Sequence, residues 1–143
     1  MMRDSERTVG ELIDRLEVAC IGSVDADGYP NMKAMLAPRV REGLRNLYFT
    51  TNTSSRRVAQ YRNNPRGCVY FCDAARFEGV MLSGTFAVLT DAASRELVWR
   101  EGDDEYYPLG VTDPDYSVLR FTALSGRYYR DLHSEDFSVS VAD

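Results

Sequence analysis

A short segment rich in hydroxyl and cationic side chains is the part of the sequence best suited to chemistry. It starts with a β-forming run at 47–51, continues through polar residues 52–55, and then carries Arg56 and Arg57. Cations at a helix N-terminus oppose the helix macrodipole, whereas free backbone N–H groups, hydroxyls and guanidinium groups together suit a phosphate. The segment therefore predicts either an anion site or an ordinary helix cap followed by two solvated arginines.

Lys33 is a second candidate for an anion site. The chain has 16 arginines and this one lysine among its 17 basic residues, so arginine is its usual cation. An exposed lysine needs no function by itself. The net charge of −5 argues against general nucleic-acid binding, which favours a basic surface. A local anion site remains compatible with an acidic chain.

The hydrophobic pattern predicts about six or seven strands and three short helices. Strands are expected at 18–24, 30–40, 47–51, 67–72, 79–89, 117–122 and 125–132, followed by a polar tail. Helices are expected from a capping box at Thr8 and Glu11, behind the polar cluster 52–55, and at 92–100 after Asp91. Tight turns join the first three strands, and strands do not alternate with helices. The pattern favours an α+β, mainly β, antiparallel barrel.

Length and composition favour one compact domain over residues 1–143. No apolar run approaches the roughly 20 residues that span a bilayer, and the first residues lack the apolar region of a secretory signal. Three cysteines in no framework spacing are typical of reduced thiols, mostly buried. We therefore expect a cytoplasmic protein with neither membrane nor nucleic-acid partners.

Two other phosphate-binding folds do not fit the pattern. A Thr/Ser-rich loop between strand and helix also occurs in flavodoxin-like proteins, but there it follows the first strand of a parallel sheet. Here hairpin-linked strands come first. The glycine-rich Walker pattern is absent as well.

The ordered motifs resemble the pyridoxamine 5′-phosphate oxidase-like, FMN-binding split barrels. The resemblance runs through 28–35, 47–51, 55–65, 69–71 and 80–84, so it covers roughly residues 10 to 90. The chain looks closest to the short, single-domain members often called general stress proteins. The resemblance implies a split barrel, bound FMN, and a homodimer with the flavin at its interface.

The resemblance also implies roles for individual residues. Lys33 would lie near the flavin phosphate or ribityl chain, and Ala34 and Met35 along the ring. The residues matching the family's remaining contacts to the ring and phosphate are Thr50, Thr51, Ser55, Arg56, Arg57 and Gln60.

Two departures from the true oxidases argue against oxidation of pyridoxamine phosphate. Pro38 stands where those enzymes place a lysine at the end of the second strand, and Gly79 where they place a glutamine. Arg39 is expected to point to the opposite face of that strand and so to be a poor replacement. We expect a chain that binds FMN but is not a true pyridoxamine 5′-phosphate oxidase.

The remaining candidates leave the reaction open. His133 is the only histidine, so multi-histidine metal sites and histidine-based triads are not expected, and no metal site is predicted. Trp99, Tyr106 and Tyr107 would either cover the flavin or a substrate, or simply pack over the barrel end. No catalytic acid or base can be named.

Three functions are compatible with these features. The first is an FMN-dependent oxidoreductase acting on an unidentified small molecule, with an unidentified electron donor. The second is a non-catalytic flavin-binding or stress protein. The third is the same fold with another cofactor, a deazaflavin or haem.

Overall fold

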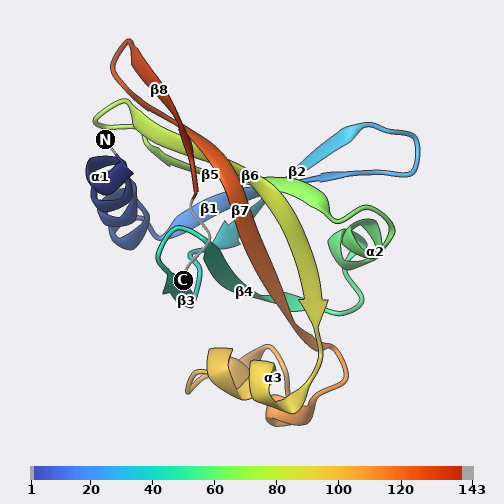
Figure 1. Cartoon of the computed structure of the whole chain (residues 1–143). Coiled ribbons are helices and arrows are strands. Elements are labelled where there is room, and N and C mark those ends of the chain that lie inside the picture. Colours follow the sequence, from blue (N-terminus) through green and yellow to red (C-terminus); the bar gives the residue numbers. More distant parts are fainter. Residues whose placement is uncertain (1, 140–143) are drawn as a thin grey trace.

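Eight strands and three helices make up the structure, a computed structural model that describes residues 2–139 (Figure 1). The helices are α1 (Met2–Arg15), α2 (Arg56–Asn63) and α3 (Ala92–Val98), and two 3-10 turns follow α3, η1 (Asp103–Glu105) and η2 (Gly110–Thr112). The strands are β1 (Val18–Val24), β2 (Pro30–Leu36), β3 (Val40–Glu42), β4 (Asn46–Asn52), β5 (Arg66–Asp73), β6 (Glu78–Leu89), β7 (Tyr116–Arg130) and β8 (His133–Ser138).

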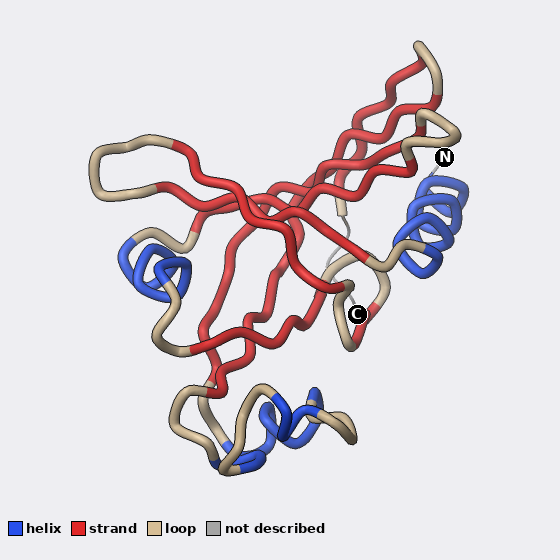
Figure 2. Tube along the Cα trace, turned by 180° about the vertical axis from the view of Figure 1, so that it is seen from behind, coloured by secondary structure: helices blue, strands red, loops and turns tan. Residues whose placement is uncertain are grey.

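All eight strands belong to one antiparallel sheet that does not close. Their order is β2-β1-β5-β6-β7-β4-β3, and β8 pairs with β7 beside this path. The strands β2 and β3 end the order and do not pair with each other. Figure 2 shows the sheet bending around on itself, with α2 beside the β1–β2 hairpin. The expected α+β, mainly β split barrel is confirmed.

The second predicted strand, 30–40, is divided in two. β2 pairs with β1 as far as Leu36, and β3 then pairs with β4 from Val40 onward. Pro38 lies between them, and it has no N–H to offer to a ladder. Its neighbour Arg39 already donates its backbone N–H to Tyr48 on β4, at 2.7 Å. The proline therefore marks the point where the chain changes its partner strand.

The C-terminal strands also differ from expectation. The predicted break between 117–122 and 125–132 is a β-bulge inside one continuous strand, β7, where the register against β6 shifts between Ser83 and Gly84. A Cβ on Gly84 would lie 1.9 Å from the carbonyl oxygen of Thr122, so only glycine fits this approach. The polar tail is the eighth strand, β8, because its backbone groups pair with β7.

The helices begin close to their predicted capping residues, with one exception. Ser55 caps α2 and Asp91 caps α3, whereas α1 begins well before Thr8. None of the helices within 2–139 has the length and hydropathy needed to cross a bilayer. Of the cysteines, Cys20 and Cys68 are half-buried and Cys72 is exposed, so the expectation of mostly buried thiols is wrong for Cys72.

The buried side chains form two separate hydrophobic clusters. The larger fills the barrel under α1 and includes Leu12, Phe71 and Phe121. The smaller lies between α3 and the other face of β4 and β7, where Tyr48, Val98, Tyr107, Tyr116 and Val118 meet. The segment after α3 is thus attached to the barrel through its own small core.

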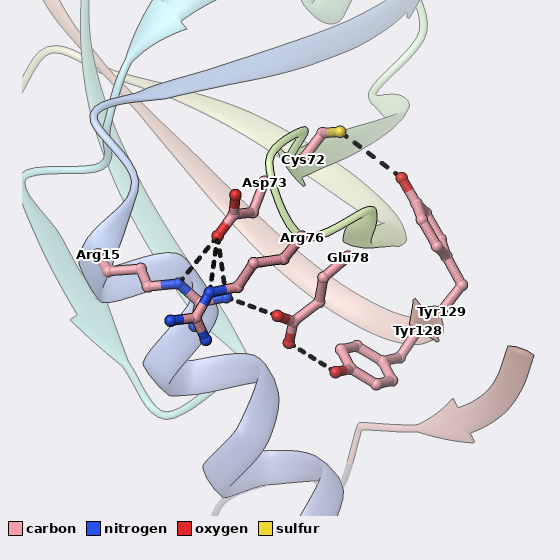
Figure 3. Close-up of polar contacts among 7 residues, drawn as sticks. All are labelled: Arg15, Cys72, Asp73, Arg76, Glu78, Tyr128 and Tyr129. Atoms are coloured by element: carbon pink, nitrogen blue, oxygen red, sulfur yellow. Dashed lines mark hydrogen bonds and ion pairs between the residues drawn. The ribbon is translucent and has the colours of Figure 1, made fainter. Parts of the chain in front are cut away.

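A polar cluster fastens the end of α1 to the β5–β6 hairpin (Figure 3). Arg15 donates to Glu78 at 2.6 Å and to Asp73 at 3.3 Å, and the Tyr128 hydroxyl donates to the second oxygen of Glu78 at 2.6 Å. Glu78 is only 4% exposed. Burial by itself raises the pKa of Glu78, but the hydrogen bonds from Tyr128 and Arg15 outweigh it and hold that pKa below its ordinary value.

Replacing Glu78 by Gln should lower the free energy of unfolding by about 2 kcal/mol at pH 7, because two hydrogen bonds to a buried charge are weakened. A carboxylate with a lowered pKa stabilises the fold above its ordinary pKa of 4.5 and loses this effect as the pH falls further. The difference between wild type and Glu78→Gln should therefore shrink below pH 4.5. Urea unfolding at several pH values measures it.

Asp136→Asn is the matched control. This change removes the same charge from an exposed pair with Arg127, and such pairs contribute at most about 1 kcal/mol. Equal losses for the two variants, or a Glu78→Gln effect that persists unchanged at pH 3, would contradict the role given to the buried carboxylate.

Candidate functional site

Two adjoining cavities lie between β2, β4 and α2. The first, the Lys33 cavity, measures about 250 Å³ and is lined by Ser23, Asn31, Met32, Lys33, Arg56, Arg57 and Gln60. The second, the Tyr106 cavity, measures about 210 Å³ and is lined by Ala34, Met35, Leu36, Ala37, Arg39, Thr50, Thr51, Asn52, Arg57, Tyr106 and Tyr107. Arg57 lines both cavities, so they form one elongated site. Together they reach the size of typical small-molecule sites, about 300–1,000 Å³.

Eight of the nine residues predicted to contact a cofactor line this site. Four of them (Lys33, Arg56, Arg57 and Gln60) line the Lys33 cavity, and Arg57 continues into the Tyr106 cavity beside the other four, Ala34, Met35, Thr50 and Thr51. The ninth, Ser55, lies just outside as the N-cap of α2. The structure thus brings residues from two strands and one helix to a single place.

The position of α2 depends on one buried side chain. Tyr61 is 2% exposed, donates its hydroxyl to the carbonyl of Gly22 at 2.9 Å, and stacks on Phe86 with ring centroids 4.1 Å apart. Beside it, the Ser23 hydroxyl donates to the side-chain carbonyl of Gln60. This contact leaves the Gln60 amide group to donate elsewhere. β1 therefore sets both the place of α2 and the orientation of Gln60.

Asp115 holds the turn that precedes α2. Its carboxylate accepts from the backbone N–H of Ser54 at 2.8 Å and from the Asn52 side chain at 3.0 Å, and the Ser54 bond lowers the pKa of Asp115. Ser55 accepts the backbone N–H of Val58 at 3.3 Å, which is ordinary capping. The hydroxyl hydrogen of Ser55 stays free, so the cap and a second contact are compatible.

The charges around the Lys33 cavity are all positive. Lys33, Arg56 and Arg57 make no ion pair with any side chain of residues 5–139, and no carboxylate lines either cavity. Some arginines elsewhere are paired with acids, as in Arg39–Asp103 and Arg41–Asp14. The Lys33 cavity therefore concentrates positive charge in a chain of net charge −5, which suits an anionic ligand.

Two buried polar atoms beside the site have no hydrogen-bond partner in the described part of the chain. They are Thr51 Oγ1 and Arg57 Nε, and both residues line the Tyr106 cavity. Buried donors and acceptors are nearly always paired, because an unpaired one costs about 1–3 kcal/mol. A ligand that reaches from one cavity into the other would supply the missing partners.

Arg39 lies at the edge of the Tyr106 cavity. Because β2 ends at Leu36, the face rule for a continuous strand does not apply, and Arg39 lines the Tyr106 cavity. Its guanidinium makes two hydrogen bonds with Asp103, both at 2.9 Å. Arg39 therefore borders the candidate site, whereas Pro38 lines neither cavity, and the charge of Arg39 is already neutralised by Asp103.

Of the three aromatic residues that were suggested to cover a flavin or a substrate, only two line a cavity. Tyr106 and Tyr107 line the Tyr106 cavity. Trp99 lines neither cavity and packs on Tyr116, with ring centroids 5.2 Å apart. Burial raises the pKa of Tyr107 to about 12, so its hydroxyl stays protonated at neutral pH.

Sequence reasoning missed Ser23, Asn31 and Asp103. Ser23 and Asn31 are cross-strand partners on the β1–β2 hairpin, and only the hairpin register brings them to α2. A serine in an apolar strand is the one sequence signal for Ser23, and Asp103 lies in an acidic run, 103–105, of a kind that is usually solvated.

A larger cavity of about 510 Å³ lies elsewhere, between the start of α1, the β3–β4 turn and the end of β8. None of the predicted site residues lines it, and neither do the buried polar atoms that lack partners. We therefore place the candidate site at α2, where charge and unpaired polar atoms coincide.

Comparisons with known proteins agree with the fold and with the sequence motifs. The family model for pyridoxamine 5′-phosphate oxidase matches residues 5–130. A protein related to general stress protein 26, from Clostridium acetobutylicum, is 40% identical, covers 95% of both chains and superposes with a TM-score of 0.87. A search of curated protein sequences gives no match.

More distant structures share the fold alone. General stress protein 26 from Bacillus anthracis str. Sterne is 17% identical, with a TM-score of 0.77 over 94% of this chain and 98% of that chain. A putative pyridoxamine 5′-phosphate oxidase from Listeria innocua is 21% identical, with a TM-score of 0.71 over 86% and 96%. By its family match and its fold, the chain belongs to the pyridoxamine 5′-phosphate oxidase family, in the branch similar to general stress protein 26.

Proposed function

We propose that this protein is a flavoprotein that binds FMN along the two adjoining cavities and uses it as an oxidoreductase on a small molecule. The family is typically flavin-binding. The observation that carries the proposal is the set of three unpaired cations (Lys33, Arg56 and Arg57) at the end of an elongated site. These cations suit the phosphate of FMN, and the Tyr106 cavity suits its ring.

Each side chain has a definite part in holding FMN. Arg56, Arg57 and Lys33 would bind the phosphate through charge-assisted hydrogen bonds, each worth about 1.5–3 kcal/mol. The Gln60 amide, oriented by Ser23, would donate to the ribityl chain or phosphate. The unpaired Thr51 hydroxyl and Arg57 Nε would find their missing partners.

The chemistry would come from the cofactor and its placement from the protein. A bound flavin exchanges a hydride or electrons with a substrate, while the protein orients the ring and tunes it. Ala34 and Met35 on β2 offer an apolar surface for the ring, and Thr50 and Thr51 on β4 offer hydrogen bonds at its edge.

The alternatives make different spectroscopic predictions. FMN, a deazaflavin and haem have distinct visible spectra, so the spectrum of the purified protein separates the cofactors. Turnover of the bound flavin with NADH or NADPH separates an oxidoreductase from a non-catalytic flavin carrier. The only histidine, His133, lies on β8, away from both cavities, which favours FMN over a histidine-ligated haem.

Replacing Arg56 and Arg57 together by Ala should weaken FMN binding by about 100-fold or more, because two charge-assisted bonds to phosphate are lost. Binding of riboflavin, which has no phosphate, should weaken by less than about threefold. Quenching of flavin fluorescence on titration with protein measures both dissociation constants.

The double change Arg62→Ala and Arg66→Ala is the control for net charge. Both arginines are exposed and line neither cavity, so FMN binding should be nearly unchanged. Equal losses of FMN and riboflavin affinity in the Arg56/Arg57 variant would show that these two arginines do not hold the phosphate.

We also propose that the flavin site is completed by a second copy of the chain. β2 forms an edge of the sheet, and its apolar side chains are uncovered, with Met32 67% and Leu36 63% exposed. On the same face of the sheet lie Val18 (52% exposed) and Met81 (41%), because directly paired residues share a face. An exposed apolar edge of this kind favours association, and it borders both cavities.

Placing a charge in this apolar face should therefore separate the two copies. Met81→Arg should sediment as a monomer at micromolar concentration and bind FMN more weakly, whereas wild type loaded with FMN should sediment as a dimer. Leu132→Arg is the matched control, because Leu132 is 95% exposed in the β7–β8 turn, far from this face. Monomeric FMN-loaded wild type would refute both the dimer and the shared site.

A further inference from the structure

The rim of the Tyr106 cavity presents an exposed aromatic ring in a fixed place. Tyr106 is 66% exposed although it lines the cavity, whereas the adjacent Tyr107 is 5% exposed. The backbone N–H groups of both tyrosines donate to the carbonyl of Asp103 at 3.0 Å, and the Tyr107 hydroxyl reaches Asn52 on β4 at 3.4 Å. The backbone that carries Tyr106 is thus tied to the barrel, while its ring is left free to contact a ligand.

The anchor of this rim is a buried ion pair. Arg39 and Asp103 have side chains only 12% and 6% exposed and share two hydrogen bonds at 2.9 Å. The backbone N–H of Arg100 donates to the same carboxylate at 2.8 Å, and the Arg100 side chain donates to the Arg39 carbonyl at 2.7 Å. Asp103 therefore holds the rim and neutralises Arg39.

The Arg39–Asp103 pairing determines how much positive charge this chain offers to a substrate in the Tyr106 cavity. Only two cationic side chains line the Tyr106 cavity, Arg39 and Arg57. Arg39 is committed to Asp103, and Arg57 is committed to the cofactor phosphate if FMN binds as proposed. An anionic substrate would therefore leave water without a cation of this chain to receive it, which is costly.

We propose, on the basis of the proposed FMN site, that its substrate is a flat conjugated molecule without negative charge, held between the flavin ring and Tyr106. Phosphorylated and carboxylated compounds are disfavoured because the Arg39–Asp103 pair leaves Arg39 without free charge. The pair thus acts as a specificity determinant, although neither side chain needs to contact the substrate. Tyr106 contacts it directly by stacking.

Two ring compounds of nearly the same shape, the neutral 2-naphthamide and the anionic 2-naphthoate, test this proposal. Full-length protein is loaded with FMN, and each compound is titrated while the visible spectrum of the flavin is followed. The amide should bind at least about tenfold tighter than the carboxylate. Tyr106→Leu should weaken amide binding about tenfold, and Tyr106→Phe should restore it, because stacking needs the ring and not the hydroxyl.

Asp103→Asn is the sharpest variant because it releases the charge of Arg39. It should raise the affinity for 2-naphthoate relative to that for 2-naphthamide about tenfold. Asp104→Asn, on the same turn but exposed and outside the ion pair, removes an equal charge and should leave the preference unchanged.

The outcomes separate this inference from the proposed function. Failure of the wild type to take up FMN, visible before any naphthyl compound is added, would refute the FMN site and this inference with it. Normal FMN uptake with equal binding of the two compounds, or with no effect of Tyr106→Leu, would refute the substrate class alone.

Discussion

The docking of α2 against β1 is the contact on which the candidate site depends. Tyr61 places its hydroxyl on the Gly22 carbonyl and its ring on Phe86, both inside the barrel wall. Burial raises the pKa of Tyr61, so the hydroxyl remains a donor under ordinary conditions. Arg56 and Arg57 lie in the first turn of the same short helix, whose buried side chains are Tyr61 and Val58. The distance of the two arginines from β2 therefore depends on how these side chains pack. A helix of eight residues would not hold that place by its own propensity.

Paired and unpaired cations lie in different parts of this protein. Some arginines that connect elements are matched by acids, as Arg15 is by Asp73 and Glu78. The cations of the Lys33 cavity are unmatched by any side chain of residues 5–139, and they would repel one another without a ligand. A bound dianion would relieve this repulsion, so the folded protein should gain stability from its ligand by linkage. The acidic remainder of the surface then keeps other polyanions away.

Local rules predicted much of the site, and long-range contacts account for the rest. The polar turn before α2 and the cap at Ser55 are properties of neighbouring residues, and turn and cap chemistry is readable at that range. The break at Pro38 was not predicted, because it depends on the change of partner strand from β1 to β4. The Arg39–Asp103 pair joins residues 64 positions apart, and only the packing of the α3 segment on β4 creates it. The β7 bulge was mistaken for a turn for a related reason, since a bulge is defined by the partner strand.

The two separate hydrophobic clusters have a consequence for how such a protein can diversify. The residues of the Lys33 cavity lie on segments packed against the larger hydrophobic cluster, whereas Tyr106 and Asp103 lie on a segment that packs on the smaller one. Changes in that segment would disturb few barrel contacts, so mutations there should have effects nearly additive with those in the barrel. Selection could then replace the rim repeatedly while the residues of the Lys33 cavity stayed in place.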